Sequence, residues 1–212
     1  MLEKLTNRNF KARCDELAQR DPDLKYIILL NGYPPFWSRR PGFATLIHIL
    51  LEQQVSLASA KAAFDKLVHR IGTVTPSRLA ALSDEEMKAC YFSRQKVIYA
   101  RHLASTIISG QLNLKQLESK DDAFTRDALQ KIKGIGEWTV DVYLMMALHR
   151  PDYFPLGDIA LLNSLKEVKY LAADTSKHEL SVIANTWKPY RTVAAFLLWH
   201  AYLCKRKAKG GH

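Results

Sequence analysis

Apolar residues recur every three or four positions along most of this chain, which is the spacing that one buried face of an α-helix produces. The longest such runs cover residues 43–52, 57–71 and 93–109. No stretch shows a convincing alternation of apolar and polar residues, the pattern of a half-buried strand. The chain is therefore predicted to form roughly ten helices and an all-α fold, without internal repeats or low-complexity segments.

Residues that favour helix ends bound these runs. Pro151 is expected to force the exit from a helix that runs from Glu137 to about His149. A last helix is expected over residues 189–203. Further helix starts are predicted from capping residues and capping boxes at Ser56, Thr75, Ser83 with Glu86, Asp121, Asp158, and Ser176 with Glu179.

The first part of the chain is predicted to contain short helices and one well-marked loop. Residues 1–30 are expected to form one or two helices, with Asp21 and Pro22 opening the second. Proline and glycine interrupt residues 31–42, so this segment is predicted to be a loop. Its aromatic side chains are expected either to line a pocket or to cover the core from outside.

One segment, Leu129–Thr139, has the pattern of a helix, a tight turn and a second helix. Gly134 can adopt left-handed dihedral angles, Gly136 has no Cβ to obstruct another backbone, and Ile135 can turn inward between the helices. The first N–H groups of the second helix then point to solvent at the positive end of its dipole, which suits a phosphate oxygen. A simple helix–helix turn is the alternative interpretation of two glycines alone. A dinucleotide site is excluded, because Thr139 replaces the third glycine of that motif and no strand precedes it.

The charge balance indicates which class of partner the protein binds. The net charge is +10 and the pI about 9.5, in a chain that is otherwise ordinary for a globular protein, with 48% hydrophobic and 25% charged residues. A basic tail over residues 205–212 supplies four of the positive charges. The excess favours nucleic acid over a membrane, because no basic amphipathic helix with a bulky apolar face is evident. A basic surface without a specific partner is the alternative.

Cysteine usage and the apolar runs indicate the compartment. Cys14, Cys90 and Cys204 are scattered and odd in number, which suits reduced thiols in an intracellular protein. No pair has the spacing of a metal cluster, so no iron–sulfur cluster is expected. The N-terminus lacks an apolar signal core, and no apolar run reaches membrane-spanning length. We expect the protein in the cytoplasm or nucleoid of a bacterium, or in the nucleus of a eukaryote.

Four motifs stand in order along the chain, namely Leu50–Ser56, Leu129–Thr139, Phe154–Asp158 and Trp187–Arg191. Together they resemble the helix-hairpin-helix (HhH-GPD) DNA glycosylases, specifically the AlkA-like branch of 3-methyladenine DNA glycosylase II. The resemblance covers about residues 21–203. It implies a two-lobed helical bundle with a helix-hairpin-helix motif and a cleft between the lobes.

The same resemblance implies a division of the chain. Residues 43–150 are expected to form the hairpin lobe, and residues 1–42 with 151–204 the second lobe, followed by the basic tail. Full-length bacterial relatives carry an N-terminal β-rich domain. Too few residues precede Gln53 in this sequence to form one, so no such domain is expected.

A glycosylase of this kind turns a damaged nucleotide out of the duplex and hydrolyses its N-glycosidic bond, leaving an abasic site in base excision repair. Asp158 matches the family's catalytic carboxylate, which stabilises positive charge on the deoxyribose and can orient the attacking water. At a helix N-terminus it should stay ionised. Taken alone, an Asp in that place is more often a helix N-cap. Asp141 and Asp152 are weaker candidates.

The resemblance also assigns a base pocket. Trp138 and Trp199 match pocket positions, where electron-rich rings attract a cationic alkylated base by roughly 0.5–2 kcal/mol each. Val142 stands where the family has a tyrosine, so the range of substrates is an open question. Bifunctional members place a lysine at the position of Trp138 to form a Schiff base. Tryptophan cannot do this, which predicts a monofunctional enzyme.

Contacts with DNA and a cation follow from the same family pattern. Gln54 matches the residue that the family inserts into the duplex, although Gln53 and Gln54 could instead cap the following helix. Lys133 replaces a frequent proline. No cofactor is required, but hairpin carbonyls of the family hold Na⁺ or K⁺, which implies Gln130, Ile132 and Gly134 here. The expected DNA contacts are Gln54, Lys133, Gly134, Ile135, Gly136 and the hydroxyl of Thr139.

Two other functions compete with the glycosylase hypothesis. One is a non-catalytic helix-hairpin-helix module that binds distorted DNA. The other is a bifunctional glycosylase/lyase that acts on oxidised bases through another lysine, for example Lys131. The expected partner is double-stranded DNA with alkylated bases and not a membrane, and the protein is expected to be a monomer. The sequence leaves open which lesions are excised and whether neutral adducts are among them.

Overall fold

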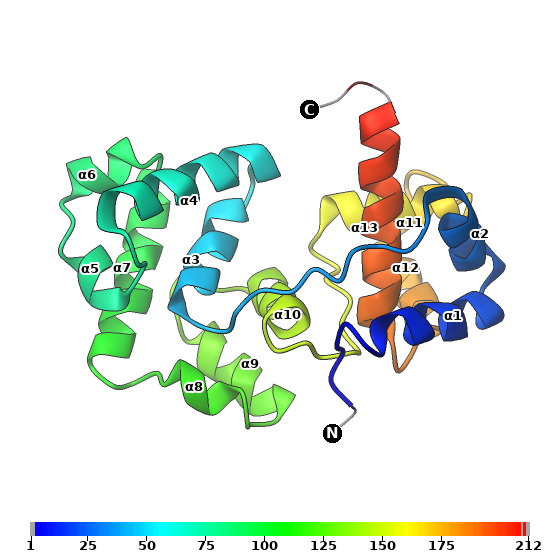
Figure 1. Ribbon diagram of the computed structural model, residues 1–212, viewed down its shortest axis with the longest axis horizontal. Helices are drawn as coiled ribbons and strands as arrows, with labels where there is room; N and C mark the ends of the chain where they lie inside the picture. The colour runs from blue at the N-terminus through cyan, green and yellow to red at the C-terminus, as the bar shows by residue number, and fades with distance from the viewer. Residues whose placement is uncertain (1–2, 209, 211–212) are drawn as a thin grey trace. The chain divides into compact units, whose positions relative to one another are not determined.

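The computed structural model describes residues 3–208 and 210 of the 212-residue chain, so part of the predicted basic tail lies outside the described residues. Within them the chain forms thirteen α-helices and no strand (Figure 1), which confirms the all-α prediction. The number exceeds the predicted ten partly because α8 (Leu114–Leu117) is too short to show periodicity. Asn113 caps that helix by accepting the N–H groups of Lys115 and Gln116.

The helices fall into two compact units, divided at Ser38/Arg39 and Tyr143/Leu144. Helix α10 (Glu137–Met146) continues across the second division. Unit 1 contains α1 (Phe10–Arg20), α2 (Pro22–Asn31), α11 (Ile159–Val168), α12 (Lys177–Asn185) and α13 (Arg191–Ala208). Unit 2 contains α3 (Phe43–Glu52), α4 (Leu57–Ile71), α5 (Pro76–Ala80), α6 (Asp84–Ala89), α7 (Arg94–Ile108), α8 and α9 (Asp122–Gln130).

Helix α13 forms the centre of unit 1. Residues 192–198 are buried on every face of this helix, and α1, α2, α11 and α12 all pack against it (Figure 1). The loop that follows α2 adds Phe36 and Trp37 to the same core, with ring centroids 5.1 Å from Phe10 and 5.3 Å from Phe196, respectively. Of the two interpretations of the loop aromatics, these contacts favour the covering of the core.

The Trp187–Arg191 motif holds unit 1 together through a buried carboxylate. Trp187 is 1% exposed, and its Nε1 donates to Oδ2 of Asp21 at 2.7 Å. Lys169 donates to both oxygens of Asp21, at 2.8 and 2.7 Å. Burial alone would raise the pKa of Asp21, but the hydrogen bonds from Lys169 and Trp187 outweigh it and hold the pKa below its ordinary value. This motif therefore has a structural role in unit 1.

Most helix ends lie within about two residues of their predicted positions. The ends of α10 and α13 differ by more. Both predicted capping boxes form, at the starts of α6 and α12. Helix α10 ends at Met146 and not near His149, because His149 adopts a φ of 56° that breaks the helix before Pro151. Helix α13 extends past the predicted end to Ala208, since basic residues suit the negative end of a helix dipole. None of the described helices has both the length and the apolar character that a membrane span needs.

In unit 2, α7 supports the turn between α9 and α10. Gly134 in that turn has a φ of 88°, in the region that only glycine adopts readily. The ring of Tyr99 from α7 lies directly against it: a Cβ added to Gly134 would meet ring carbons at 2.2 Å. At Gly136 an added Cβ would meet no atom within 4 Å. The two glycines therefore serve different purposes, one for packing and one for an open surface.

We predict that Gly134→Ala lowers the free energy of unfolding by roughly 2–4 kcal/mol, because the methyl group is strained at this φ and overlaps the Tyr99 ring. Urea denaturation followed by circular dichroism measures the change. The matched control is Gly136→Ala, for which we expect a loss within about 1 kcal/mol. Equal losses for the two variants would contradict the close packing of Tyr99 against the turn.

A second prediction concerns Asp21 in unit 1. Asp21→Asn should cost roughly 2–3 kcal/mol of stability at pH 7, because Lys169 and Trp187 lose a charged acceptor. The folded pKa of Asp21 lies below the ordinary value of 3.8, so this stabilisation is complete above pH 3.8 and is lost as the pH falls through the folded pKa.

Urea denaturation of the wild type and of Asp21→Asn, at pH values from 7 down to 2, should therefore show their free energies of unfolding converging in acid. Asp23→Asn is the control, and it should cost less, since the Asp23 side chain is 36% exposed. A difference between wild type and Asp21→Asn that persists unchanged to pH 2 would refute the assignment.

Candidate functional site

The helix-hairpin-helix segment presents an open turn on a buried base. Ile132 and Ile135 are only 3% and 4% exposed, so both side chains turn inward and hold the turn on the core of unit 2. Lys133 and Gly136 are exposed. By helix geometry the first N–H groups of α10 have no acceptor within the helix, and they start at this turn. The segment thus offers backbone donors beside an open glycine and a lysine.

Charged side chains join the two helices of the hairpin. Arg126 on α9 forms ion pairs with Glu137 and Asp141 on α10. The side chain of Gln130 also donates to Glu137, at 2.5 Å. These contacts join the two helices and engage the carboxylate of Asp141, one of the weaker catalytic candidates.

Helix α7 contacts the turn through two side chains. His102 lies three residues after Tyr99, so the two share one face of the helix. Its Nδ1 accepts the backbone N–H of Lys133 at 3.0 Å. No motif in the sequence points to a role for Tyr99, His102 or Arg126. The turn that Tyr99 and His102 contact lies about thirty residues along the chain, and no local pattern reveals such a contact.

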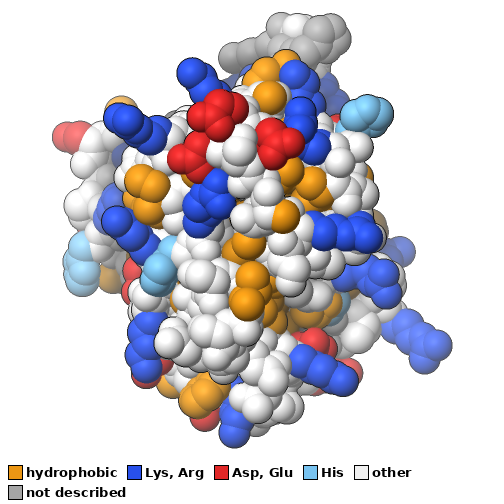
Figure 2. All heavy atoms as spheres, turned by 90° about the vertical axis from the view of Figure 1, so that its left-hand side faces the viewer, with side chains coloured by type: hydrophobic (Ala, Val, Ile, Leu, Met, Phe, Trp, Pro, Cys, Tyr) orange, Lys and Arg blue, Asp and Glu red, His pale blue; other side chains and the backbone are white. Residues whose placement is uncertain are grey.

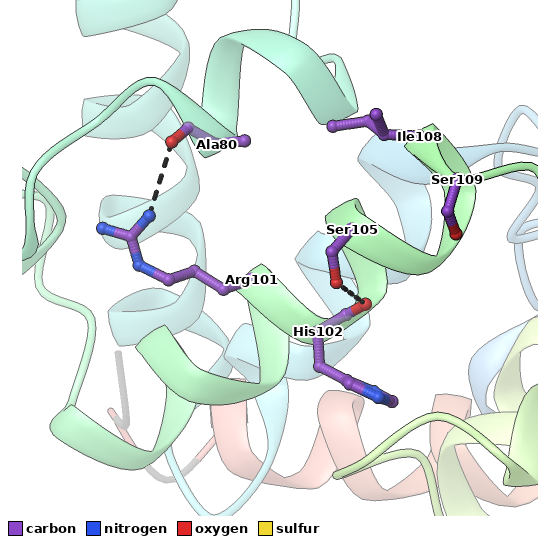
Figure 3. Close-up of a pocket in the computed structure, with 6 residues that line it drawn as sticks. All are labelled: Ala80, Arg101, His102, Ser105, Ile108 and Ser109. Carbon is purple, nitrogen blue, oxygen red and sulfur yellow. Dashed lines mark hydrogen bonds between the residues drawn. The ribbon is translucent and has the colours of Figure 1, made fainter.

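A surface pocket of about 460 Å³ lies along α7 and the end of α5 (Figure 3). Arg101 closes one side by donating to the carbonyls of Ala80 and Leu82, at 3.4 and 2.7 Å. The described residues that line it include none of the predicted site residues, but they include His102, which also accepts the N–H of Lys133. Its lining residues are Ala80, Arg101, His102, Ser105, Ile108 and Ser109.

The junction between α3 and α4 carries Gln54, the predicted inserted residue. Gln54 is exposed and has a φ of 58°, which residues other than glycine seldom adopt. Ser56 caps α4 by accepting the N–H of Ser59 at 3.1 Å. Neither glutamine is therefore needed as the cap of α4, which was the competing interpretation.

Gln53 instead contacts the hairpin. Its Nε2 donates to the carbonyl oxygen of Gly134 at 2.8 Å and to Oγ1 of Thr139 at 2.9 Å. Thr139 is 1% exposed. The Thr139 hydroxyl is thus buried and accepts a hydrogen bond from within the protein, and its contact with a phosphate stays a prediction.

Asp158 lies in unit 1, at the start of α11. Its Oδ1 accepts the N–H of Leu161 at 2.8 Å, so the residue is the N-cap of α11. The side chain is half-buried, neither enclosed in the apolar core nor fully exposed. The capping contact uses one carboxylate oxygen, and an ionised carboxylate has about four acceptor positions. Capping and a catalytic role are therefore compatible.

The other weak candidate, Asp152, is part of a packing contact. Its carboxylate accepts from Arg191 at two points, at 2.8 and 3.0 Å. Such a two-point ion pair holds both side chains in one orientation. Asp152 thus joins the chain before Asp158 to the start of α13.

The two predicted base-pocket tryptophans belong to different units. Trp138 is half-buried in the first turn of α10, within unit 2. Trp199 is half-buried on α13 in unit 1, with ring centroids 6.5 Å from Trp37 and 5.9 Å from Phe196. Val142, at the position of the family's tyrosine, is 2% exposed. Contact of either tryptophan with a base stays a prediction.

Two of the three hairpin carbonyls predicted to hold a cation accept hydrogen bonds within the protein. The carbonyl of Ile132 accepts the N–H of Ile135 at 3.0 Å, and that of Gly134 accepts from Gln53. Gln130 is the last residue of α9, where carbonyls lack partners within the helix. Each carbonyl has two lone pairs, so these bonds are compatible with a shared ion. No group of three His, Cys, Asp or Glu side chains in the described part of the chain is arranged to hold a metal.

Basic side chains outnumber acidic ones on one face of unit 2. On the face of unit 2 turned to the viewer in Figure 2, Lys and Arg side chains are widely spread and Asp and Glu side chains are fewer. A polyanion approaching this face meets a favourable field.

Comparison with known proteins identifies the superfamily of the chain. Residues 47–189 match the model of the HhH-GPD superfamily base excision DNA repair proteins. DNA-3-methyladenine glycosylase 1 of Schizosaccharomyces pombe is 30% identical over 190 residues, which are 86% of this chain and 83% of that protein. A Bacillus subtilis relative named YfjP, described as a DNA-3-methyladenine glycosylase by assignment only, is 30% identical over 164 residues. The chain spans 57% of the length of that relative.

A solved structure shares the fold. The S. pombe 3-methyladenine DNA glycosylase in complex with abasic DNA has a TM-score of 0.81 and 27% identity, covering 89% of this chain and 95% of that one. The matched region includes the α3–α4 junction, the hairpin and Asp158. The chain therefore belongs to the HhH-GPD superfamily of base excision DNA repair proteins.

Proposed function

We propose that this protein is a monofunctional DNA glycosylase that excises alkylated purines of the 3-methyladenine and 7-methylguanine class. The observation that carries the proposal is the half-buried carboxylate of Asp158 at the start of α11, in a chain that also presents the open hairpin turn. Relatives named as 3-methyladenine glycosylases support the substrate class.

The hairpin would bind the DNA backbone. The N–H groups at the start of α10 and the side chain of Lys133 suit one phosphate, without reading sequence. The open space at Gly136 lets the backbone of DNA come close. Gln54, exposed at the α3–α4 junction, would occupy the gap that the extruded nucleotide leaves.

Asp158 would then act on the sugar. As the base departs, positive charge spreads over the deoxyribose ring, and a fixed carboxylate stabilises it more in that transition state than in the substrate. N-capping of α11 holds the carboxylate in place, so little reorganisation is needed. An alkylated base is already cationic and leaves without a strong acid, which fits the single carboxylate in the proposal.

Tryptophan at position 138 supports hydrolysis over lyase chemistry, because an indole cannot form a Schiff base with the sugar. The product would be an intact abasic site. The partner would be double-stranded DNA inside the cell, bound by a monomer. A Na⁺ or K⁺ ion at the carbonyls of Gln130, Ile132 and Gly134 would add positive charge beside the phosphate, and it stays part of the proposal.

We predict that Asp158→Asn slows release of 7-methylguanine from methylated duplex DNA by at least about 100-fold in single-turnover assays. Asparagine caps helices as well as aspartate does, so the fold should persist. Affinity for a duplex with an abasic-site analogue should stay within about threefold, since the phosphate contacts are unchanged.

Unchanged release by Asp158→Asn would overturn the catalytic assignment. No base release by the wild-type protein from any methylated DNA would favour a non-catalytic binding module. A covalent DNA adduct of the wild type, trapped by borohydride, would identify a lyase instead.

A further inference from the structure

The end of α3, which leads into the Gln54 turn, is held at several points within unit 2. Arg39 donates to both carboxylate oxygens of Glu52, at 3.0 and 2.7 Å. Nζ of Lys96, from α7, donates to the carbonyl of Leu51 at 2.7 Å. Burial lowers the pKa of Lys96. The last turn of α3 therefore has a fixed position against α7.

Gln53 continues this set of contacts toward the hairpin. A backbone carbonyl can only accept a hydrogen bond, so the oxygen of Gly134 requires the NH₂ end of the Gln53 amide to face it. That NH₂ group has two hydrogens, and the second acceptor is the buried hydroxyl of Thr139. One side chain thus joins the end of α3 to both the turn and the second helix of the hairpin.

The residue held in this way is the immediate neighbour of Gln54. Successive Cα atoms are about 3.8 Å apart, and only two backbone dihedrals per residue are soft. Fixing Gln53 therefore restricts where Gln54 can point. Gln54 also has a left-handed backbone conformation, which residues other than glycine keep only where the surroundings hold it.

We propose that Gln53 is a positioning residue: its amide fixes the inserted Gln54 relative to the phosphate-binding turn. The inference rests on the proposed function. Phosphate contact and side-chain insertion then occur on one rigid element, and no separate ordering of the α3–α4 junction is needed at the moment of nucleotide extrusion. Gln53 itself contacts neither base nor sugar in this scheme.

The contribution of Gln53 should depend on how hard the nucleotide is to extrude. An unpaired or mismatched base costs less to extrude than a paired one, so it needs less help from an inserted side chain. A loss of packing in unit 2, in contrast, would weaken the enzyme on all substrates equally. Dependence on pairing is therefore the signature that separates positioning from a structural role.

Gln53→Met tests this, because methionine keeps the length of the side chain and removes both donors. Single-turnover release of 7-methylguanine is measured with the lesion opposite cytosine and opposite an abasic-site analogue. We expect release about tenfold slower than wild type when the lesion is paired, and within about twofold when it is unpaired. Gln116→Met, the same substitution at an exposed position of α8, should leave both rates unchanged.

Gln54→Ala provides a second comparison. If Gln53 acts through Gln54, the double variant should be little slower on the paired lesion than Gln54→Ala alone, since the two losses are not additive. Additive losses, or equal slowing of Gln53→Met on paired and unpaired lesions, would overturn the proposal. The melting temperature of each variant shows whether the fold is retained.

A binding measurement separates this inference from the proposed function. A 2-aminopurine base beside an abasic-site analogue changes its fluorescence when a side chain enters the duplex. Gln53→Met should give at most half the wild-type change at saturating protein, and a full change would overturn the inference. If the wild type releases no base but shows the fluorescence change, the proposed function fails. The fluorescence of Gln53→Met then still decides whether Gln53 positions the inserted residue.

Discussion

The contact between the Tyr99 ring and the Cα of Gly134 is the constraint on which the hairpin of unit 2 depends. It requires a residue without a Cβ at a φ that only glycine adopts readily, so backbone and packing demand the same residue. His102, one helical turn along α7, accepts the neighbouring backbone N–H. With this side of the turn fixed by α7, the other side stays open at Gly136. A surface that binds phosphate by backbone donors needs this combination, because such donors act only where the backbone is both ordered and accessible.

The carboxylates show how the same residue type takes different roles according to its neighbours. Asp21, Asp141 and Asp152 each form an ion pair with a Lys or Arg of another part of the chain. Asp158 lies at the start of a helix, where a backbone N–H holds it in place. The first three contribute to stability. The fourth is the half-buried N-cap of α11, and its contact with the sugar is part of the proposed function.

Much of this could be predicted from the sequence, for identifiable reasons. Helix starts at Ser83, Ser176 and Asp121 followed from caps whose chemistry is local, and the inward position of Ile135 followed from the two glycines beside it. The contacts of Tyr99, His102 and Gln53 could not be predicted, because each joins segments 31 to 86 residues apart through a single side chain. The burial of Thr139 was missed for the same reason. Helix α10 ends before the predicted position and His149 has a left-handed φ, which its residue type does not indicate.

The central claim is that the hairpin turn binds a DNA phosphate while Asp158 stabilises the sugar of an extruded nucleotide. A crystal structure of the protein with a duplex containing an uncleavable abasic-site analogue tests it most directly. The account predicts one phosphate within hydrogen-bond distance of the backbone N–H groups at the start of α10, and the Asp158 carboxylate within about 3–4 Å of the extruded sugar ring. A complex in which the DNA lies away from the hairpin, or in which Asp158 faces no nucleotide, would contradict it.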